Sequence, residues 1–256
     1  MNLPVIVTAF KIFFRVKGGI LGPLVLLLTL YLVEGSFWQG LIDKSPTIAD
    51  YHHLDLLFYS LTSLTIFQIT SVAGDPDSLS GHIENGSLTM YLLNPCPYLE
   101  RMLSIQIAAI AARSLVFLPL LFLILWFVGF PFSANQVLGL VAILPLAGLL
   151  NFLINSIISM LSFWLNGSYA FVQIKETLFW VLSGALIPLD FLPIQLSSIL
   201  KFFPPAYVVY FPARIFIGKE DFWPIASGSI GSLAIFFTVY GLIMGRGLVK
   251  FQSHGG

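Results

Sequence analysis

The stretch SLVFLPLLFLILWFVG, residues 114–129, has no charged side chain and belongs to a longer apolar run from Leu103 to Gly129. A helix over that run, rising 1.5 Å per residue, is long enough to cross the roughly 30 Å hydrocarbon core of a bilayer. Pro119 inside the run indicates a kink and not an end, because helices within a membrane tolerate proline. The run therefore predicts a membrane-spanning helix.

Five more apolar runs of comparable length occur along the chain. They cover about Gly19–Trp38, Leu54–Ala73, Val137–Leu165, Tyr169–Leu189 and Phe222–Gly245. The 256 residues are 57% hydrophobic and only 9% charged, whereas soluble domains carry roughly 25% charged residues. The formal net charge is zero, so no basic surface points to nucleic acid. The sequence predicts an all-α integral membrane protein, residues 1–256 forming a single transmembrane domain with six transmembrane helices.

The basic residues indicate how the chain is oriented. Residues 1–18 mix apolar side chains with Lys11, Arg15 and Lys17, which predicts an amphipathic helix lying in the membrane interface. If both termini are cytoplasmic, more lysines and arginines fall on the inner side than on the outer side, as membrane proteins prefer. We expect a multi-pass protein of the cell inner membrane with both termini in the cytoplasm. A cleaved signal peptide is the alternative for the first apolar run.

A short polar segment, SGHIENGSLTMYLLNP, residues 80–95, lies within a predicted cytoplasmic loop that covers residues 75–101. Asp77 or Ser78 can cap a helix of about two turns, and Gly86 can end it. A helix this short is unstable in water by itself, so it must dock on something. The candidates are a partner protein and the lipid surface.

A second irregular segment, residues 190–219, follows the fifth run. Its two apolar halves are separated by Lys201 and by the pair Pro204–Pro205, and each half is too short to cross a bilayer. Backbone of this kind is tolerated at membrane depth only when it packs on protein or lines water. We expect an extracellular re-entrant helical hairpin between spans five and six.

Polar residues within the predicted spans are candidates for a polar pathway. Arg113 lies near the middle of the third span, and Lys175 and Glu176 lie at a comparable depth in the fifth. A charge at that depth is costly, so we expect an Arg113–Glu176 ion pair, serving either a polar route or a structural clamp. Asn151 and Asn155 share one helix face, where they form interhelical hydrogen bonds or contact a substrate.

Recognisable catalytic motifs are missing. The sequence has no phosphate-binding loop, no nucleophile elbow and no zinc-protease helix. The single cysteine, Cys96, excludes an intramolecular disulfide. His52 and His53, with Asp50 and Asp55, fit a solvated loop better than a metal site, so we expect no metal. Because the motifs above are missing, we also expect no cofactor and no catalytic residue in this chain.

Three stretches resemble a known family. The pattern I-x-x-G-x-L-x-x-x-L-L-x-P over residues 83–95 resembles the permease subunits of type-2 ATP-binding-cassette exporters, and most of all a bacterial subfamily with six spans and no fused ATPase. SGALIPLDFLP, residues 183–193, followed by FFPPAYVVYFP, residues 202–212, resembles the outer hairpin of that family. RGLVKFQSHGG, residues 246–256, resembles its C-terminal tail. The resemblance covers nearly the whole chain.

The resemblance implies a permease that is moved by a separate ATPase, which binds the ATP and Mg²⁺. A coupling helix in the first cytoplasmic loop would contact that ATPase through Asp77, Ser80, His82, Ile83, Glu84 and Gly86. Members of the subfamily often have a basic residue where this chain has Glu84, which points to a dedicated ATPase. An outer gate would be formed by Phe202, Phe203, Tyr207 and Tyr210.

The implied assembly contains two copies of the cytoplasmic ATPase subunit, a second permease as a homodimer or heterodimer, and membrane lipids, without nucleic acid. A pathway with mostly apolar walls suits a lipid-like, amphipathic or drug-like substrate that is exported. Two alternatives stay open. A secondary transporter would need buried carboxylates at the midplane, where only Glu176 qualifies, and a membrane scaffold would organise a complex without transport.

Overall fold

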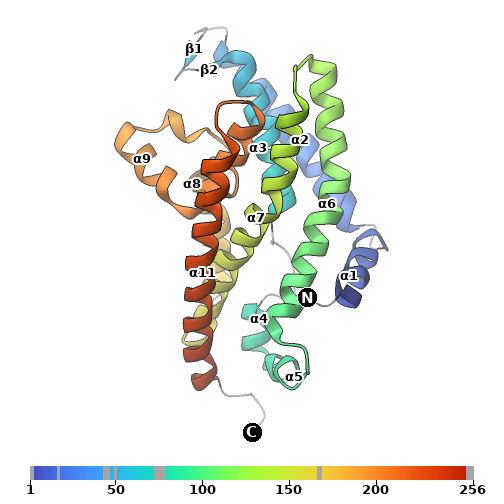
Figure 1. Ribbon diagram of the computed structural model, residues 1–256, viewed down its shortest axis with the longest axis vertical. Helices are drawn as coiled ribbons and strands as arrows, with labels where there is room; N and C mark the ends of the chain where they lie inside the picture. The colour runs from blue at the N-terminus through green and yellow to red at the C-terminus, as the bar shows by residue number, and fades with distance from the viewer. Residues whose placement is uncertain are drawn as a thin grey trace.

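A computed structural model describes residues 3–15, 18–42, 47–48, 51–71, 79–165 and 169–251 (Figure 1). The first half of the chain forms α1 (Leu3–Arg15), α2 (Gly18–Ile42), β1 (Thr47–Ile48), β2 (Tyr51–His52), α3 (His53–Thr70), α4 (Leu79–Glu84), α5 (Leu88–Leu92) and α6 (Tyr98–Val128). The second half forms α7 (Ala134–Ser159), η1 (Met160–Phe163), α8 (Tyr169–Leu182), η2 (Leu189–Phe191), α9 (Ile194–Phe202), η3 (Pro204–Tyr207), α10 (Tyr210–Phe216) and α11 (Phe222–Lys250). The two strands pair antiparallel over two residues each.

The predicted all-α architecture is confirmed, and every predicted span contains a helix. Within the described ranges, four helices are long and apolar enough to cross a membrane, namely α2, α6, α7 with η1, and α11. The helix α3 is a shorter apolar helix. Pro119 and Pro145 lie inside α6 and α7, which continue through them without a break. The first predicted segment also forms a helix, α1, which packs along α6.

The fifth predicted span is shorter than expected. We predicted Tyr169–Leu189, but α8 ends at Leu182, and its 14 residues reach only about 21 Å. The helix ends because Gly184 adopts a left-handed conformation, with a φ of 75°. The carbonyl groups of this turn are satisfied by α3, since the Tyr59 hydroxyl donates to Gly184 at 2.7 Å and the Ser63 hydroxyl donates to Ala185 at 2.8 Å. Irregular backbone is therefore accommodated inside the protein.

The helix α3 occupies the centre of the bundle and contacts α2, α6, α7 and α10. Most of its side chains are buried, including several serines and threonines. Several of these hydroxyls are satisfied within the helix, as in Thr65 and Thr70, which donate to the carbonyl groups of Leu61 and Ile66 four residues earlier. The Tyr31 hydroxyl of α2 also bonds to Thr65. Local bonding lets polar residues lie in an apolar core at little cost.

The long helices give the bundle two distinct ends (Figure 1). One end carries β1, β2 and the short helices α9 and α10, and we call it the hairpin end. The other carries α4, α5 and the last turns of α11, and we call it the α4–α5 end. Candidate functional residues gather at both.

Candidate functional site

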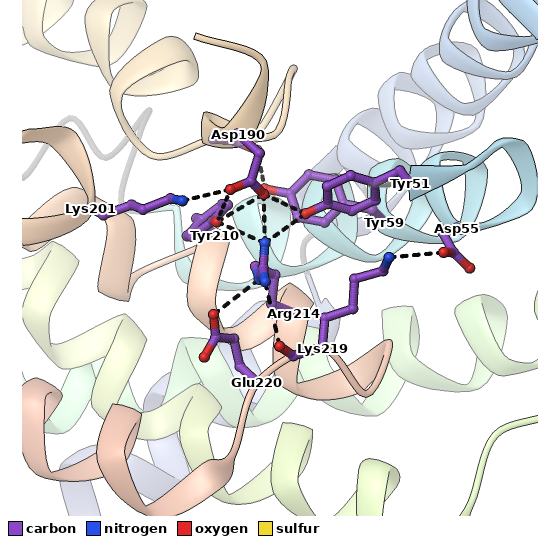
Figure 2. Close-up of polar contacts among 10 residues, drawn as sticks. Tyr51, Asp55, Tyr59, Asp190, Lys201, Tyr210, Arg214, Lys219 and Glu220 are labelled. Atoms are coloured by element: carbon purple, nitrogen blue, oxygen red, sulfur yellow. Dashed lines mark hydrogen bonds and ion pairs between the residues drawn. The ribbon is translucent and has the colours of Figure 1, made fainter. Parts of the chain in front are cut away.

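A charged cluster at the hairpin end is centred on the carboxylate of Asp190, which lies in η2 (Figure 2). Lys201 of α9 donates to Oδ1 at 2.6 Å, and Arg214 of α10 donates to Oδ2 at 2.5 Å. The hydroxyl groups of Tyr51 and Tyr210 donate to the same carboxylate at 2.6 and 2.9 Å. Four donors from β2, α9 and α10 therefore converge on one acidic side chain.

Arg214 extends this cluster toward the start of α11. Its Nε lies 3.2 Å from Glu220, and its Nη1 contacts the hydroxyl groups of Tyr51 and Tyr210 at 3.0 Å. Lys219 forms a separate ion pair of 2.9 Å with Asp55, at the first turn of α3. The cluster therefore ties the hairpin to α3 and to α11.

The cluster fixes the protonation of its members. Burial raises the pKa of the Asp190 carboxyl, but the hydrogen bonds from Lys201, Tyr51 and Tyr210 and the charge of Arg214 outweigh that effect, so the pKa falls below its ordinary value of 3.8. Burial also raises the pKa of the phenols of Tyr51 and Tyr210. Asp190 is therefore an anion at neutral pH, and both phenols remain hydrogen-bond donors.

A cavity of about 510 Å³ opens beside the cluster. Its charged lining consists of Lys201, Arg214 and Lys219 against the single carboxylate of Asp190. The rest of the wall is formed by Tyr51, Leu192, Ile194, Ser197 and Ser198. The cavity therefore combines an excess of basic side chains with an apolar flank.

The four residues predicted for an outer gate do not share one surface. Phe202 is 88% exposed and Phe203 is also exposed, at the end of α9. Tyr207 packs its ring against Phe211, 4.8 Å away. Tyr210 is fully buried and belongs to the Asp190 cluster. Phe202 and Phe203 remain candidates for an exposed gate, whereas Tyr210 acts in holding the hairpin together.

At the opposite end, α4 forms as predicted, and Gly86 ends it with a positive φ of 74°. The residues predicted to contact a partner split into two groups. Ser80, His82 and Ile83 are buried, and the His82 ring bonds to the Tyr98 hydroxyl at 3.1 Å. Glu84 is exposed. Asp77, the remaining acidic residue of the prediction, lies outside the described residues together with Ser78.

The helix α4 packs on the bundle of the chain itself, a contact that neither candidate of the sequence analysis, a partner protein or the lipid surface, includes. Leu79 and Ile83 of α4 belong to an apolar cluster with Met160 and Phe163 of η1 and with Tyr240 of α11. A six-residue helix gains stability from such packing, which its own backbone cannot supply. The exposed surface of this segment is formed by other residues. Glu84 and Asn85 are exposed at the tip of α4, and Met90 and Leu93 of the α5 segment are 74% and 82% exposed.

The polar residues inside the bundle are paired differently from the prediction. Glu176 forms its ion pair with the neighbouring Lys175 at 2.5 Å, and Arg113 donates to the backbone carbonyl group of Ser71, so the predicted Arg113–Glu176 pair is not formed. The guanidinium of Arg113 is thereby linked to the carbonyl group that follows the end of α3.

The two asparagines confirm the prediction of interhelical hydrogen bonds. Asn151 of α7 donates to the carbonyl group of Thr70 on α3 at 2.8 Å. Asn155, one turn later, accepts from Lys175 of α8 at 3.0 Å. Together they join three helices in the half of the bundle near α4.

Sequence reasoning missed two sites. The first is the Asp190 cluster. Asp190 and Arg214 both lie in the predicted hairpin, so their pairing could have been inferred, but Tyr51 precedes Asp190 by 139 residues in the sequence. Glu34, within the first apolar run, is buried, and its Oε2 has no hydrogen-bond partner within the described structure. The charge of Glu34 in that run was the available signal.

A family model described as ABC-2 family transporter protein matches residues 24–255. No curated protein matches the chain. The matched residues include α3 to α11 entirely, and thus both candidate sites.

Proposed function

Since the chain belongs to the ABC-2 transporter family and is a multi-pass permease subunit of an ATP-binding-cassette transporter, we propose that it exports a lipid-like, amphipathic or drug-like substrate, driven by a separate ATPase. A family of this kind implies a partner ATP-binding subunit in general. The observation that carries the proposal is α4, a short helix packed firmly on the bundle with an exposed tip.

The packing of α4 supports a mechanical role. Its apolar face lies on η1, the continuation of α7, and η1 in turn packs on α11, where Phe163 lies over Gly247. A side chain at Gly247 would overlap the Phe163 ring, so the two helices meet at close range. A displacement of α4 would therefore move the ends of α7 and α11 as rigid elements, which is how closure of an ATPase reaches the membrane helices.

The exposed surface of this segment defines the expected contact with the ATPase. Met90 and Leu93 provide apolar anchors, and Glu84 and Asn85 provide a polar edge. Apolar anchors with a polar rim are typical of specific protein interfaces. The acidic Glu84 favours an ATPase with a basic residue at the edge of its cleft.

The proposed assembly places both termini in the cytoplasm of a cell with an inner membrane. It contains two ATPase subunits, which bind ATP and Mg²⁺, and a second permease as a homodimer or heterodimer. The α4–α5 end would then face the cytoplasm and the hairpin end the outside, in agreement with the distribution of lysine and arginine in the sequence.

The test is co-purification from the native membrane in mild detergent, with ATPase activity as a second readout. We expect an ATPase to accompany the wild-type chain and the Leu93→Glu variant to lose it by at least about tenfold, because a charge enters an apolar anchor. Trp223→Glu is the matched control, since it places the same charge on an exposed apolar side chain at the start of α11, outside the proposed gate and the proposed contact surface. The proposal fails if no nucleotide-binding protein accompanies the wild type, or if both variants behave alike.

A further inference from the structure

The helix α11 connects the two ends of the bundle (Figure 1). It begins at the hairpin end and finishes at the α4–α5 end, and its 29 residues extend over about 43 Å. It packs along α7 and also contacts η1 and η3. One helix therefore touches short elements at both ends of the molecule.

An aromatic ring packs directly on a glycine of α11 at each of these contacts. The Phe163 ring of η1 lies on Gly247, and the Tyr207 ring of η3 lies on Gly228. A Cβ atom at either glycine would overlap the ring. Because no flexible side chain separates the ring from the helix backbone, a displacement of the ring passes to the helix with little loss.

The remaining glycines of α11 have no such neighbours. A Cβ atom at Gly231, Gly241 or Gly245 would meet no other atom of the described structure within 4 Å. Among the glycines of this helix, close packing on a ring therefore occurs at the two ends and not along the middle.

The contact at Gly228 leads to the Asp190 cluster through a row of rings. The Tyr207 ring lies 4.8 Å from that of Phe211, and the Phe211 ring lies 5.0 Å from that of Tyr210. The Tyr210 hydroxyl donates to Asp190 at 2.9 Å. A shift of α11 at Gly228 would therefore act on the residues that hold the hairpin together.

The helix α7 offers a second connection, because η1 continues it and its Gly139 packs against Ile215 of α10. Pro145 lies inside α7 and removes one hydrogen bond of the helix, so α7 bends more readily at that point. Residues 225–250 of α11 contain no proline. The helix α11 is therefore the stiffer of the two connections.

We propose that α11 is a rigid rod that couples the α4–α5 end to the hairpin, with Gly247 and Gly228 as its points of contact. A shift of α4 and η1 displaces α11 through Phe163, and α11 displaces η3 through Tyr207, which is a shear motion of packed helices. The use of this coupling in transport rests on the proposed function. The coupling itself needs no ATPase, so it can fail while the proposed export function stands, and the reverse.

The experiment measures hydrogen–deuterium exchange of the full purified chain in mild detergent. Gly247→Ala forces α11 away from Phe163 at a distance of about 28 Å along the helix from Gly228, and we expect exchange in η3 and α10 to rise about fivefold. Exchange in α2 should stay as in the wild type, which separates coupling from a general loss of stability. Gly245→Ala is the matched control, because it adds the same methyl group in open space.

Further variants show whether the effect depends on the contact at Gly247. Phe163→Ala removes that contact without any overlap and should also raise exchange in η3. Phe163→Leu combined with Gly247→Ala makes room for the methyl group and should return exchange to the level of the wild type. Equal exchange of the hairpin in Gly247→Ala and the wild type, or equal increases in Gly247→Ala and Gly245→Ala, would overturn the proposal.

A double-mutant cycle with Tyr207→Ala separates α11 from α7 as the connection. Because Tyr207→Ala removes the contact at Gly228, Gly247→Ala should cause no further change of exchange in α10 in this background. A change in α10 that persists would assign the coupling to α7 and would also overturn the proposal.

Discussion

The hairpin end and the α4–α5 end both contain helices too short to be stable alone, yet they are held differently. At the hairpin end, short helices that pack in the main apolar core are also joined by an ionic cluster around Asp190, supplied by β2, α9 and α10. At the α4–α5 end, α4 is joined to η1 by apolar packing of Leu79 and Ile83. A hydrogen-bonded ionic network is directional and cooperative, whereas hydrophobic attraction is non-directional.

This difference fits the work that each end is proposed to do. If α4 transmits a displacement from the ATPase, it must keep its contact with η1 while it moves, and non-directional apolar packing allows that. A hairpin that closes off the other end needs one defined position, which a buried network of charges specifies. The comparison predicts that single substitutions have larger effects on stability at the hairpin end.

The largest effect should follow from Arg214→Gln. The substitution removes the cation that Asp190 and Glu220 share, but Asp190 keeps Lys201 and two phenols, so the loss should be about 2–3 kcal/mol of the free energy of unfolding, less than the cost of an unpaired buried charge. Thermal unfolding of the purified protein, monitored by tryptophan fluorescence, measures it. Trp38 reports locally, because its ring lies 5.7 Å from Phe191 beside Asp190.

Lys201→Gln serves as the control, since it removes a more exposed cation from the same carboxylate. Its loss of stability should be much smaller. If Arg214→Gln and Lys201→Gln melt at the same temperature, the cluster does not depend on Arg214 and the contrast between the two ends is lost.

The helices themselves were predictable because membrane spans depend on hydropathy, which the sequence displays directly. The early end of α8 was not, because the turn at Gly184 is stabilised by Tyr59 and Ser63, which are more than a hundred residues away. We predicted that the span continues to Leu189 because the residues of the turn after α8 are apolar. They are apolar because this turn is buried, as Ala185 and Leu189 are.

The candidate sites were predictable to different degrees. The position of α4 followed from its capping and turn residues, but its buried face did not, because six residues give too little periodicity to separate an inner from an outer face. Hence His82 and Ile83 were expected at a partner surface and are buried. The Asp190 cluster combines residues from distant segments, which one sequence cannot bring together.

A smaller effect is expected at the α4–α5 end from Ile83→Ala. The side chain is buried against η1, so its truncation should cost about 2 kcal/mol, near the low end for buried isoleucine because a short helix can settle into the space. Glu84→Ala, one residue further and exposed, is the control and should be nearly neutral. Chemical denaturation of both variants gives the comparison, and equal losses would mean that α4 is not held by its apolar face.

The smallest effect is the dependence of the hairpin on acid. The pKa of Asp190 is depressed in the folded protein, so the carboxylate contributes stability at any pH above the ordinary value of 3.8. That contribution declines as the pH falls below 3.8 and through the lower pKa of the folded state, because protonation weakens the contacts with Lys201 and Arg214. Stability should therefore fall between neutral pH and pH 3 in the wild type, with Trp38 fluorescence as the probe.

The Asp190→Asn variant separates this carboxylate from the other acidic groups of the chain. It should be less stable than the wild type at neutral pH, because Lys201 and Arg214 lose their common anion. Its stability should also fall less on acidification, since the group that titrates is gone. Parallel acid profiles for the two proteins would assign the acid dependence to carboxylates outside the cluster. The hairpin would then owe its position to apolar packing, as α4 does.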